Sequence, residues 1–318
     1  MRSIILILVH FGELPNYFNL WLKSAEFNPT IDFLLVTDNS LEEYTFPKNV
    51  QIINSSMVEI QSEIQNVTNQ KVSIKYPYKL VEYRPLFGEL FQSLIGGHDF
   101  WGYIDSDVIL GDVRKFLTDE LLDQYDRLLT RGHFTLFRNT KYMNTVYKIE
   151  HEYKDCFNFN DVMRFDSVCA YDEWGWDFGY GLSEILSRKG IVSYDQIIFA
   201  DINPAIYYFD LVNHDFGNAE YFIFNNGKLV AHREKQEKEF MYIHLQKRQL
   251  SNFVGEEAHY YIYPDRFSVA KETTETLEEQ EKLFYSRKKK RRIKTILTKI
   301  KSDYLLMRLT MLFRRVSK

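Results

Sequence analysis

Two carboxylates separated by one residue, Asp105 and Asp107, directly follow the apolar and aromatic segment 100–104 (FWGYI). That segment predicts a short buried strand, so the acids stand at its carboxyl end, where α/β folds bind nucleotides. Mg²⁺ and Mn²⁺ prefer a few protein oxygens combined with substrate phosphates. The pair therefore predicts a divalent cation site that holds a diphosphate without a glycine-rich loop, although Asp-X-Asp also occurs in ordinary surface turns.

His244 and Lys247 are the second pair that such a site needs, and they follow a predicted strand near Phe240. An imidazole at a strand end can complete a metal shell, and a lysine three residues later can neutralise a β-phosphate. Each residue alone is typical of an ordinary core or surface position, so the prediction depends on their combination. We predict metal ligation by Asp105, Asp107 and His244, with Asp105 and Lys247 contacting the bound nucleotide.

The DEWGWD segment that begins at Asp172 places three acids among tryptophan rings. Sugars present apolar faces that stack on aromatic rings, and a carboxylate can accept the proton of a sugar hydroxyl. We predict that Trp174 and Trp176 bind an acceptor and that Asp172 or Glu173 is the catalytic base, with Asp177 as an alternative base. The competing interpretation is a tryptophan-rich loop packed on the core.

Two dipeptides have side chains suited to a nucleotide. Thr37-Asp38 ends an apolar segment, and polar residues at strand ends bind nucleotides in α/β folds. Tyr83-Arg84 can stack on a nucleobase or contact phosphate, although a helix-entry turn explains the proline that follows equally well. We predict that all four residues contact the nucleotide.

The elements that must position these residues alternate as in a βαβ protein. Segments 4–9 and 33–36 predict buried strands, and 16–24 predicts a helix between them. A further helix follows Pro85 and ends at Gly96-Gly97. Later segments predict strands at 133–138, 205–209 and 221–224 and a helix at 182–188. The pattern indicates an α/β fold, Rossmann-like, with a mostly parallel central sheet flanked by helices.

Composition sets the class of the protein. A chain of 318 residues that is 45% apolar can bury a full α/β core. Two cysteines, Cys156 and Cys169, are too few for a disulfide framework and fit no zinc spacing, so they indicate buried thiols in a cytoplasmic protein. The apolar run 4–9 is too short for a signal peptide or a membrane span.

The last 32 residues, 287–318, have a different charge from the rest. They contain 13 Lys or Arg and one acid, a net of +12, so the rest of a chain of net charge −4 carries −16. Apolar residues recur there at helical spacing: Ile293, Ile296, Leu297, Ile300, Tyr304, Met307 and Met311. We predict a basic amphipathic helix that docks reversibly on an anionic membrane, where each nearby cation contributes about 1 kcal/mol.

A polybasic tail also suits a nucleic acid or a partner helix. We favour the membrane and expect no nucleic acid, because the apolar periodicity continues beyond the charge cluster and a phosphate-binding arm would not need it.

The chain resembles the GT-A glycosyltransferases in the order of five features. These are the strand at 4–10, Thr37-Asp38, the Asp105 to Asp107 turn, Asp172-Glu173 and His244. The tryptophan segment looks like that of inverting galactosyltransferase-like enzymes, although its first two acids precede the tryptophans. His244-X-X-Lys247 is similar to the metal ligand and phosphate lysine of glycogenin-like transferases, without their neighbouring glycine and Pro-Trp. Within this group the chain looks most like bacterial proteins encoded with capsule and O-antigen genes.

This resemblance implies a metal-dependent glycosyltransferase that moves a hexose from a nucleoside diphosphate sugar, with a UDP-sugar as the expected donor. The acceptor would be a hydroxyl of a glycan or lipid-linked glycan in surface polysaccharide synthesis, at the inner face of the plasma membrane. The implied organisation is a GT-A catalytic domain at 1–255, a linker or helical extension at 256–286 and the membrane tail at 287–318. The nucleotide-sugar half would end near 115 and the acceptor half would occupy 116–255.

Two functions from other classes compete with this interpretation. A non-catalytic carbohydrate-binding or scaffold protein would use the tryptophans without turnover. A metal-dependent nucleotidyltransferase or phosphohydrolase also pairs acids on α/β strands, but it would be expected to carry more acids for two metals or a glycine-rich phosphate loop. Whether a transferase would invert or retain the anomeric configuration stays open.

Overall fold

The computed structural model describes residues 1–72, 74–212, 214–272, 281–282, 284–285 and 303–316. Its centre is a seven-stranded sheet in which only β7 runs against its neighbours, so the predicted mostly parallel α/β sheet is confirmed. The strand order is β10 (Ser193–Tyr194), β6 (Arg127–Leu128), β7 (Phe134–Arg138), β4 (Phe100–Ile104), β1 (Ile4–His10), β2 (Ile31–Thr37) and β3 (Val50–Asn54).

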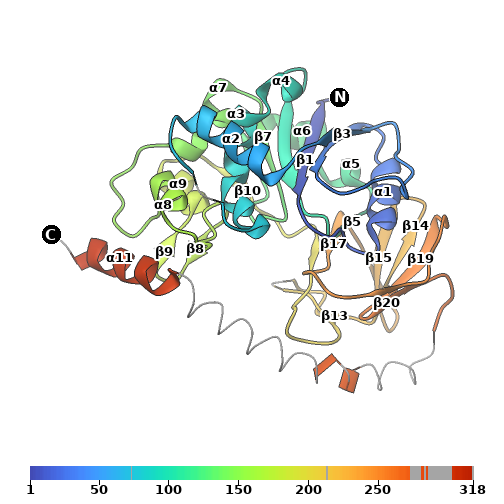
Figure 1. Ribbon diagram of the computed structural model, residues 1–318. Helices are drawn as coiled ribbons and strands as arrows, with labels where there is room; N and C mark the ends of the chain where they lie inside the picture. The colour runs from blue at the N-terminus through green and yellow to red at the C-terminus, as the bar shows by residue number, and fades with distance from the viewer. Residues whose placement is uncertain (73, 213, 273–280, 283, 286–302, 317–318) are drawn as a thin grey trace.

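Both faces of this sheet are covered by helices (Figure 1). Along β1, Ile5 and Ile7 belong to the core on one face, and Ile4 and Leu6 to the core on the other. Successive strand residues point to opposite faces, so a strand buried on both sides is apolar throughout. α1 (Phe18–Glu26) packs on one face and α2 (Met57–Thr68) on the other. The remaining helices are η1 (Pro77–Leu86), α3 (Phe87–Leu90), α4 (Gln92–Ile95), α5 (Val113–Phe116), α6 (Asp119–Gln124), α7 (Lys141–Asn144), η2 (Val146–Lys148), α8 (Phe159–Arg164), α9 (Leu182–Arg188) and α11 (Tyr304–Val316).

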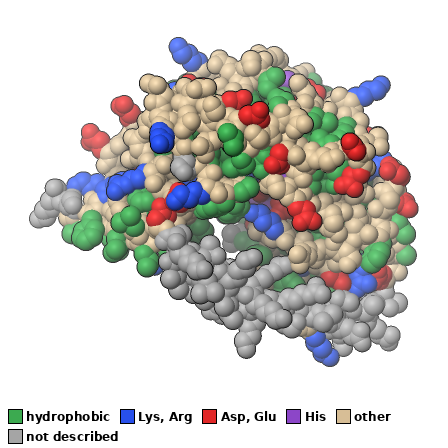
Figure 2. All heavy atoms as spheres, in the orientation of Figure 1, with side chains coloured by type: hydrophobic (Ala, Val, Ile, Leu, Met, Phe, Trp, Pro, Cys, Tyr) green, Lys and Arg blue, Asp and Glu red, His purple; other side chains and the backbone are tan. Residues whose placement is uncertain are grey.

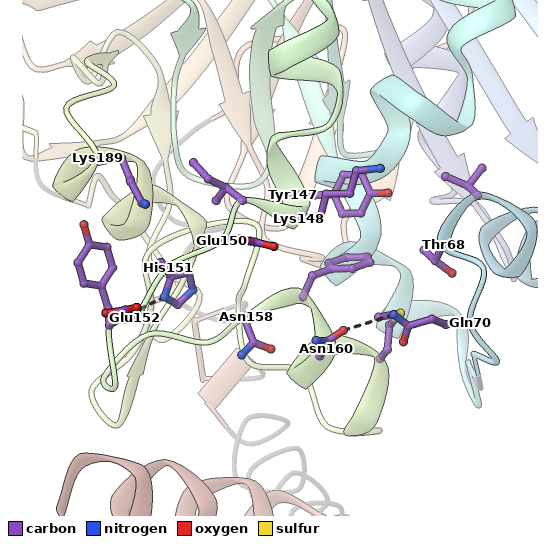
Figure 3. Close-up of a pocket in the computed structure, with 15 residues that line it drawn as sticks. Thr68, Gln70, Tyr147, Lys148, Glu150, His151, Glu152, Asn158, Asn160 and Lys189 are labelled. Atoms are coloured by element: carbon purple, nitrogen blue, oxygen red, sulfur yellow. Dashed lines mark hydrogen bonds between the residues drawn. The ribbon is translucent and has the colours of Figure 1, made fainter. Parts of the chain in front are cut away.

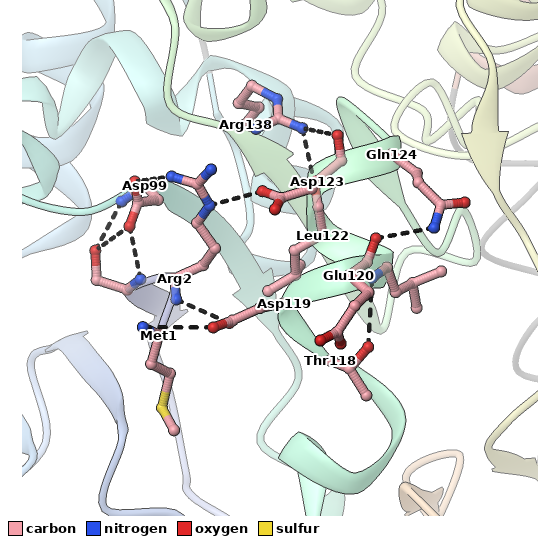
Figure 4. A network of polar contacts seen from close by, with 12 residues as sticks. Met1, Arg2, Asp99, Thr118, Asp119, Glu120, Leu122, Asp123, Gln124 and Arg138 are labelled. Atoms are coloured by element: carbon pink, nitrogen blue, oxygen red, sulfur yellow. Dashed lines mark hydrogen bonds and ion pairs between the residues drawn. The ribbon is translucent and has the colours of Figure 1, made fainter.

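A polar network stabilises the end of the central sheet where β1 and β4 begin (Figure 4). The Arg2 guanidinium lies 3.3 Å from the carboxylate of Asp99 and 2.7 Å from that of Asp123, and the Asp99 carboxylate also accepts from the Ser3 backbone N–H at 2.8 Å. These contacts hold the start of β1 beside the start of β4 and against α6. They stand at the opposite end of the strands from the Asp105 to Asp107 turn.

A second sheet of six strands, antiparallel except for the parallel pair of β18 and β20, packs beside α1 (Figure 1). Its order is β16 (Gln236–Phe240), β15 (Lys228–Arg233), β14 (Tyr221–Asn225), β19 (His259–Tyr263), β20 (Arg266–Ser268) and β18 (Ser251–Asn252). Its inner residues form a third core. The predicted end of the catalytic domain at residue 255 falls inside this sheet, so we correct that boundary to residue 268 or beyond.

Two local predictions differ from the structure. The strand predicted at 205–209 is mostly turn, and only Phe209–Asp210 (β12) pairs, with Asn218–Ala219 (β13). The helix predicted after Pro85 is divided into a 3₁₀ segment and the short α3 and α4, because the chain leaves helical geometry at Phe91. Short elements of this kind are set by their packing rather than by local periodicity.

The end of the chain lies partly outside the described residues. Most of 272–286, predicted as a linker or helix, and tail residues Ile293, Ile296, Leu297 and Ile300 fall there. α11 lies against the hairpin of β8 (Gly175–Trp176) and β9 (Gly179–Tyr180) (Figure 1). Within the part that the structure describes, no helix is long and apolar enough to cross a membrane.

Candidate active site

A short three-stranded sheet places three of the chemical residues side by side. Its order is β11 (Ala200–Asp201), β17 (Tyr242–His244) and β5 (Val108–Leu110). His244 pairs with Asp201 on one side and with Val108, the residue after Asp107, on the other. Three segments far apart in sequence therefore converge at the carboxyl end of β4.

The turn that carries the two aspartates is fixed from α1 and β7. The Trp21 indole N–H donates to the Asp105 carbonyl at 3.2 Å, and the Asp105 backbone N–H donates to the His133 carbonyl at 3.0 Å. The Asp107 carboxylate accepts from the backbone N–H of Lys247. These three contacts join the turn to segments distant in sequence, so the direction of the two carboxylates is fixed.

Asp105, Asp107 and His244 each offer one ligand atom, and these three atoms lie within 4.8 Å of one another. The Nε2 atom of His244 lies 3.5 Å from an Asp107 oxygen and 3.8 Å from an Asp105 oxygen. Ligands of Mg²⁺ lie about 2.0–2.1 Å from the ion, so two ligand atoms of one ion are roughly 3 to 4 Å apart. The three side chains therefore fit one small divalent cation.

The other ring nitrogen of His244 has its own partner. Nδ1 lies 2.9 Å from the Asp201 carboxylate, which also accepts from the Gln246 amide at 2.7 Å. A carboxylate behind a metal-ligating histidine fixes the orientation of its ring and directs Nε2 at the ion. Burial disfavours the charged imidazole, but the carboxylates of Asp107 and Asp201 outweigh it and raise the pKa of His244 to about 10.

The same neighbourhood contains a second histidine. The His133 ring stacks on the His244 ring with centroids 4.3 Å apart, and the Tyr242 hydroxyl lies 3.0 Å from its Nδ1. Burial holds the pKa of His133 well below its ordinary value, so this ring is neutral. His133, Asp201 and His244 are also close enough to share an ion. We favour the Asp105, Asp107 and His244 group, because Asp201 already accepts from Gln246.

Gln246 and Lys247 have unusual backbone conformations, with φ of 54° and 53°. The left-handed region is uncommon for residues other than glycine, and strain of this kind is concentrated at functional sites. The conformation lets the Lys247 N–H reach Asp107 and places the Lys247 ammonium 3.6 Å from the centre of the Tyr78 ring. A cation held beside two carboxylates in this way is suited to a phosphate group.

Arg84 joins the two halves of the site. Its guanidinium contacts the Asp105 carboxylate, lies 3.5 Å from that of Asp172 and donates to the Gly132 carbonyl at 2.8 Å. Burial opposes its charge, but the two carboxylates more than compensate and raise the pKa of Arg84. Arg84 thus holds the carboxylates of Asp105 and Asp172 in one arrangement.

Asp172 and Glu173 differ in their surroundings. Asp172 is 1% exposed, pairs with Arg84, and its backbone carbonyl accepts from the Arg127 side chain. The carboxyl of Glu173 is directed at Gly132, and its side chain has neither a hydrogen bond nor an ion pair with the residues that the structure describes. Burial raises the pKa of both carboxyls, and the neighbouring Asp172 raises that of Glu173 further. Of the two acids, Asp172 is therefore the one paired with Arg84.

These side chains line one cavity of about 350 Å³. Of the residues predicted from sequence it collects seven, namely Arg84, Asp105, Asp107, Asp172, Glu173, His244 and Lys247. It also contains residues that the sequence prediction missed, namely Tyr78, Val81, Arg131, His133, Asp201 and Gln246. Asp201 had a signal, because it follows an apolar run from Ile197 to Ala200, just as Asp105 follows 100–104.

Three aromatic residues that the sequence predicted for the site lie outside this cavity. Tyr83 is fully buried and its ring packs on Phe159, so it has no face for a nucleobase. The Trp174 indole donates to Thr130 at 2.9 Å. Trp176 lies on β8, is 46% exposed and donates to a backbone carbonyl. The structure thus assigns Tyr83 a packing role and leaves both tryptophans beside the cavity rather than in it.

Thr37 and Asp38 lie at the carboxyl end of β2, next to the end of β1. The Thr37 hydroxyl accepts from Asn39 at 2.8 Å, and Asp38 is exposed with its carboxylate 3.4 Å from the Gly12 backbone N–H. Asn39 also lines a separate hollow of about 580 Å³. The two predicted residues shape the loop beside that hollow and are not among the residues that line the acidic cavity.

A larger hollow of about 810 Å³ lies between α2, η2 and α8 (Figure 3). Its polar side chains support the nearby fold. The His151 ring contacts the backbone of Tyr153 and Phe157, and the Lys148 ammonium pairs with Glu89 at 2.8 Å. The candidate metal groups found among the described residues all contain His244. We therefore place the chemistry in the smaller cavity.

Replacing Asp201 with Asn is expected to weaken Mn²⁺ binding about 10- to 100-fold, because loss of a carboxylate behind a metal-bound histidine has that effect. Isothermal titration with Mn²⁺ measures it. Asp215→Asn, at an exposed position, is the control and should bind Mn²⁺ as the unchanged protein does. Equal affinity in the Asp201 variant would show that Asp201 does not orient His244.

Comparison with known proteins gives a family and a set of distant structures. Residues 6–271 match the model of a family described as "Family of unknown function (DUF6625)". No curated protein matches the chain. The galactosyltransferase LgtC, solved with donor and acceptor sugar analogs, is 12% identical over 63% of this chain and 75% of its own, with a TM-score of 0.34. The apo glycosyltransferase GlyE of Streptococcus pneumoniae TIGR4 is 12% identical over 45% of this chain and 35% of its own, with a TM-score of 0.26.

Proposed function

For this chain, which belongs to the DUF6625 family, we propose a metal-dependent glycosyltransferase that moves a hexose from a nucleoside diphosphate sugar to a hydroxyl of an acceptor. One observation carries the proposal. A single cavity contains a group that fits a divalent cation, a lysine, and an acid, Glu173, whose side chain pairs with none of the described residues. A cation and a lysine suit a diphosphate leaving group, and the separate acid suits an acceptor hydroxyl.

Asp105, Asp107 and His244 would hold the cation, with Mn²⁺ or Mg²⁺ favoured by the two carboxylates. When bound, the ion would supply Lewis-acid stabilisation of charge on the diphosphate. Lys247 would neutralise a further phosphate oxygen. The remaining ligands would come from the nucleotide and water, as Mg²⁺ usually retains several non-protein ligands.

Glu173 would take the proton of the acceptor hydroxyl, with Asp172 and Arg84 positioning it. Burial and the neighbouring Asp172 raise the pKa of Glu173, so its carboxylate is a stronger base than that of an exposed glutamate. Such a base suits an inverting reaction, in which the hydroxyl attacks the anomeric carbon directly. In a retaining reaction Glu173 would not have this role.

UDP-sugars are the donors that we propose, with a glycan or lipid-linked glycan of surface polysaccharide as the acceptor. Thr37 and Asp38 would contact the nucleoside from the carboxyl end of β2. We place the reaction at the cytoplasmic face of the plasma membrane, where the basic tail would keep the enzyme.

The proposal predicts that UDP binds only when a divalent cation is present. Isothermal titration with UDP should give binding with Mn²⁺ and none after the metal is removed with EDTA. A screen of UDP-hexoses for release of UDP then tests turnover. Binding of UDP without metal would contradict the assignment, and sugar binding without any release of UDP would favour a carbohydrate-binding protein.

A further inference from the structure

Helix α11 is apolar on two opposite sides. Met307 and Met311 are fully buried, whereas a second stripe is open to solvent. The stripe consists of large apolar side chains at spacings of three, four and seven residues: Leu305 (60% exposed), Leu306 (56%), Leu309 (50%), Leu312 (44%) and Val316 (78%). A helix on the surface of a soluble domain normally has one apolar side, so the second side needs a partner.

The inner side of α11 is fixed to the body of the protein. The Asp303 carboxylate, one residue before the helix, accepts from the backbone N–H groups of Asp166 and Ser167 at 2.7 and 2.9 Å. Near the other end, the two terminal nitrogens of Arg314 donate to the Asp161 carboxylate at 2.8 and 2.7 Å. Contacts at both ends set the rotation of the helix, so the outer stripe points away from the body.

The exposed side of α11 differs from the side that the sequence predicted to face a membrane. The sequence predicted that Tyr304, Met307 and Met311 belong to the face that meets a membrane. In the structure the two methionines pack into the core, and Met311 lies next to Gly179 of the β8–β9 hairpin. The outer stripe is shifted by about half a turn of the helix and belongs to a separate set of residues.

Positive charge borders the outer stripe. Arg308 and Arg315 are exposed, and their guanidinium groups lie 5.6 Å from the Phe178 ring and 5.9 Å from the Tyr180 ring. Hydrophobic and basic side chains stand together along this helix (Figure 2). The sequence 287–318 contains 13 Lys or Arg and one acid.

We propose that the outer stripe of α11 inserts into the interfacial layer of an anionic lipid bilayer, with the flanking arginines at the headgroups. An amphipathic surface with leucines on one side and cations around it has the chemistry of interfacial helices. A second copy of the chain would bring two strongly basic segments together, which like-charge repulsion opposes. A nucleic acid would use the cations but leave the leucines exposed.

The position of α11 also determines what meets the membrane, a consequence that rests on the proposed transferase function. The hairpin packed on α11 begins at Gly175, two residues after Glu173. Docking through the outer stripe therefore brings the acceptor-side segment of the site to the bilayer. An acceptor whose hydroxyl is held near the headgroups by a lipid anchor fits this geometry.

Co-sedimentation of the full chain with vesicles tests the proposal. The chain should bind vesicles of equal phosphatidylcholine and phosphatidylglycerol and bind pure phosphatidylcholine at least tenfold more weakly. The double variant Leu309→Asp/Leu312→Asp should lose at least tenfold in affinity for the anionic vesicles. Val58→Asp, at an exposed apolar position on α2, is the matched control and should bind as the unchanged protein does.

Several results would overturn the proposal. They are no binding of the unchanged chain to anionic vesicles, equal binding of the double variant, or a dimer in light scattering that the double variant dissociates. An unchanged melting temperature establishes that the double variant is folded. UDP titration without vesicles is a separate measurement, so a chain that binds vesicles but not UDP would refute the transferase function and leave membrane docking intact.

Discussion

Replacing Asp107 with Asn is expected to abolish Mn²⁺-dependent binding of UDP and to lower kcat/KM for transfer by about 1000-fold. Asp107 is one of the three residues that we propose as ligands of the divalent cation, and its carboxylate also accepts from the Lys247 backbone N–H. Metal stabilisation of developing charge is worth several kcal/mol, and each 1.36 kcal/mol corresponds to a factor of ten in rate. Isothermal titration measures the binding, and release of UDP from a UDP-hexose measures the rate.

The Asp107 experiment has a matched control in Asp215→Asn, an exposed aspartate whose replacement should leave UDP binding unchanged. The amide of Asn has nearly the shape of the carboxylate, so a loss of binding in a variant with an unchanged melting temperature reports the lost charge. A variant that still binds UDP in the presence of Mn²⁺ with the original affinity would remove Asp107 from the metal site.

Glu173→Gln is expected to lower kcat by about 100- to 10,000-fold, the usual contribution of a general base, with the affinity for UDP and Mn²⁺ unchanged. The carboxyl lines the cavity, and its side chain pairs with none of the described residues. Rates of transfer under saturating donor measure the effect. Asp215→Asn, at an exposed position with no predicted role in the site, should keep the original rate.

The stereochemistry of the product is a second test of the proposed role of Glu173. Proton NMR of the newly formed linkage distinguishes an inverted from a preserved anomeric configuration. Inversion together with the loss of rate in Glu173→Gln supports the role as base. A preserved configuration, with the variant still active, would show that the enzyme retains configuration and that Glu173 acts otherwise.

The contacts of Arg84 explain why Asp172 and Glu173 are not equivalent. Arg84 holds Asp172 and Asp105 at the same time, so removing either partner leaves a cation in a partly desolvated position. We therefore propose Asp172 as a positioning residue, because Glu173 could exchange a proton without breaking the Arg84–Asp172 pair. Two adjacent carboxyls acquire different roles from their surroundings alone.

Local sequence was sufficient for the features that depend on neighbouring residues. The buried strand 100–104 and the acids that follow it could be predicted because an apolar segment ending in Asp-X-Asp places the acids at a strand end. The parallel sheet was equally readable, since a strand buried on both faces must be apolar throughout. The helix at 182–188 has its predicted limits in the structure.

Features that depend on distant contacts could not be read in this way. Asp201 meets His244 only because β11 and β17 pair, and no local pattern relates two residues 43 positions apart. The six-stranded sheet and the burial of Tyr83 likewise follow from packing. The tail shows the distinction most clearly.

Periodicity predicted an amphipathic helix in the tail, because apolar spacing is a property of the helix itself, and the structure describes the part at Tyr304–Val316. Which side is open to solvent was decided by the tertiary structure alone. Met307 and Met311 are buried because they pack into the core, where Met311 lies against Gly179 of the hairpin. Leu309 is 50% exposed because the described residues cover only half of it. A sequence specifies the pattern of each element, whereas burial belongs to the pair of surfaces that meet.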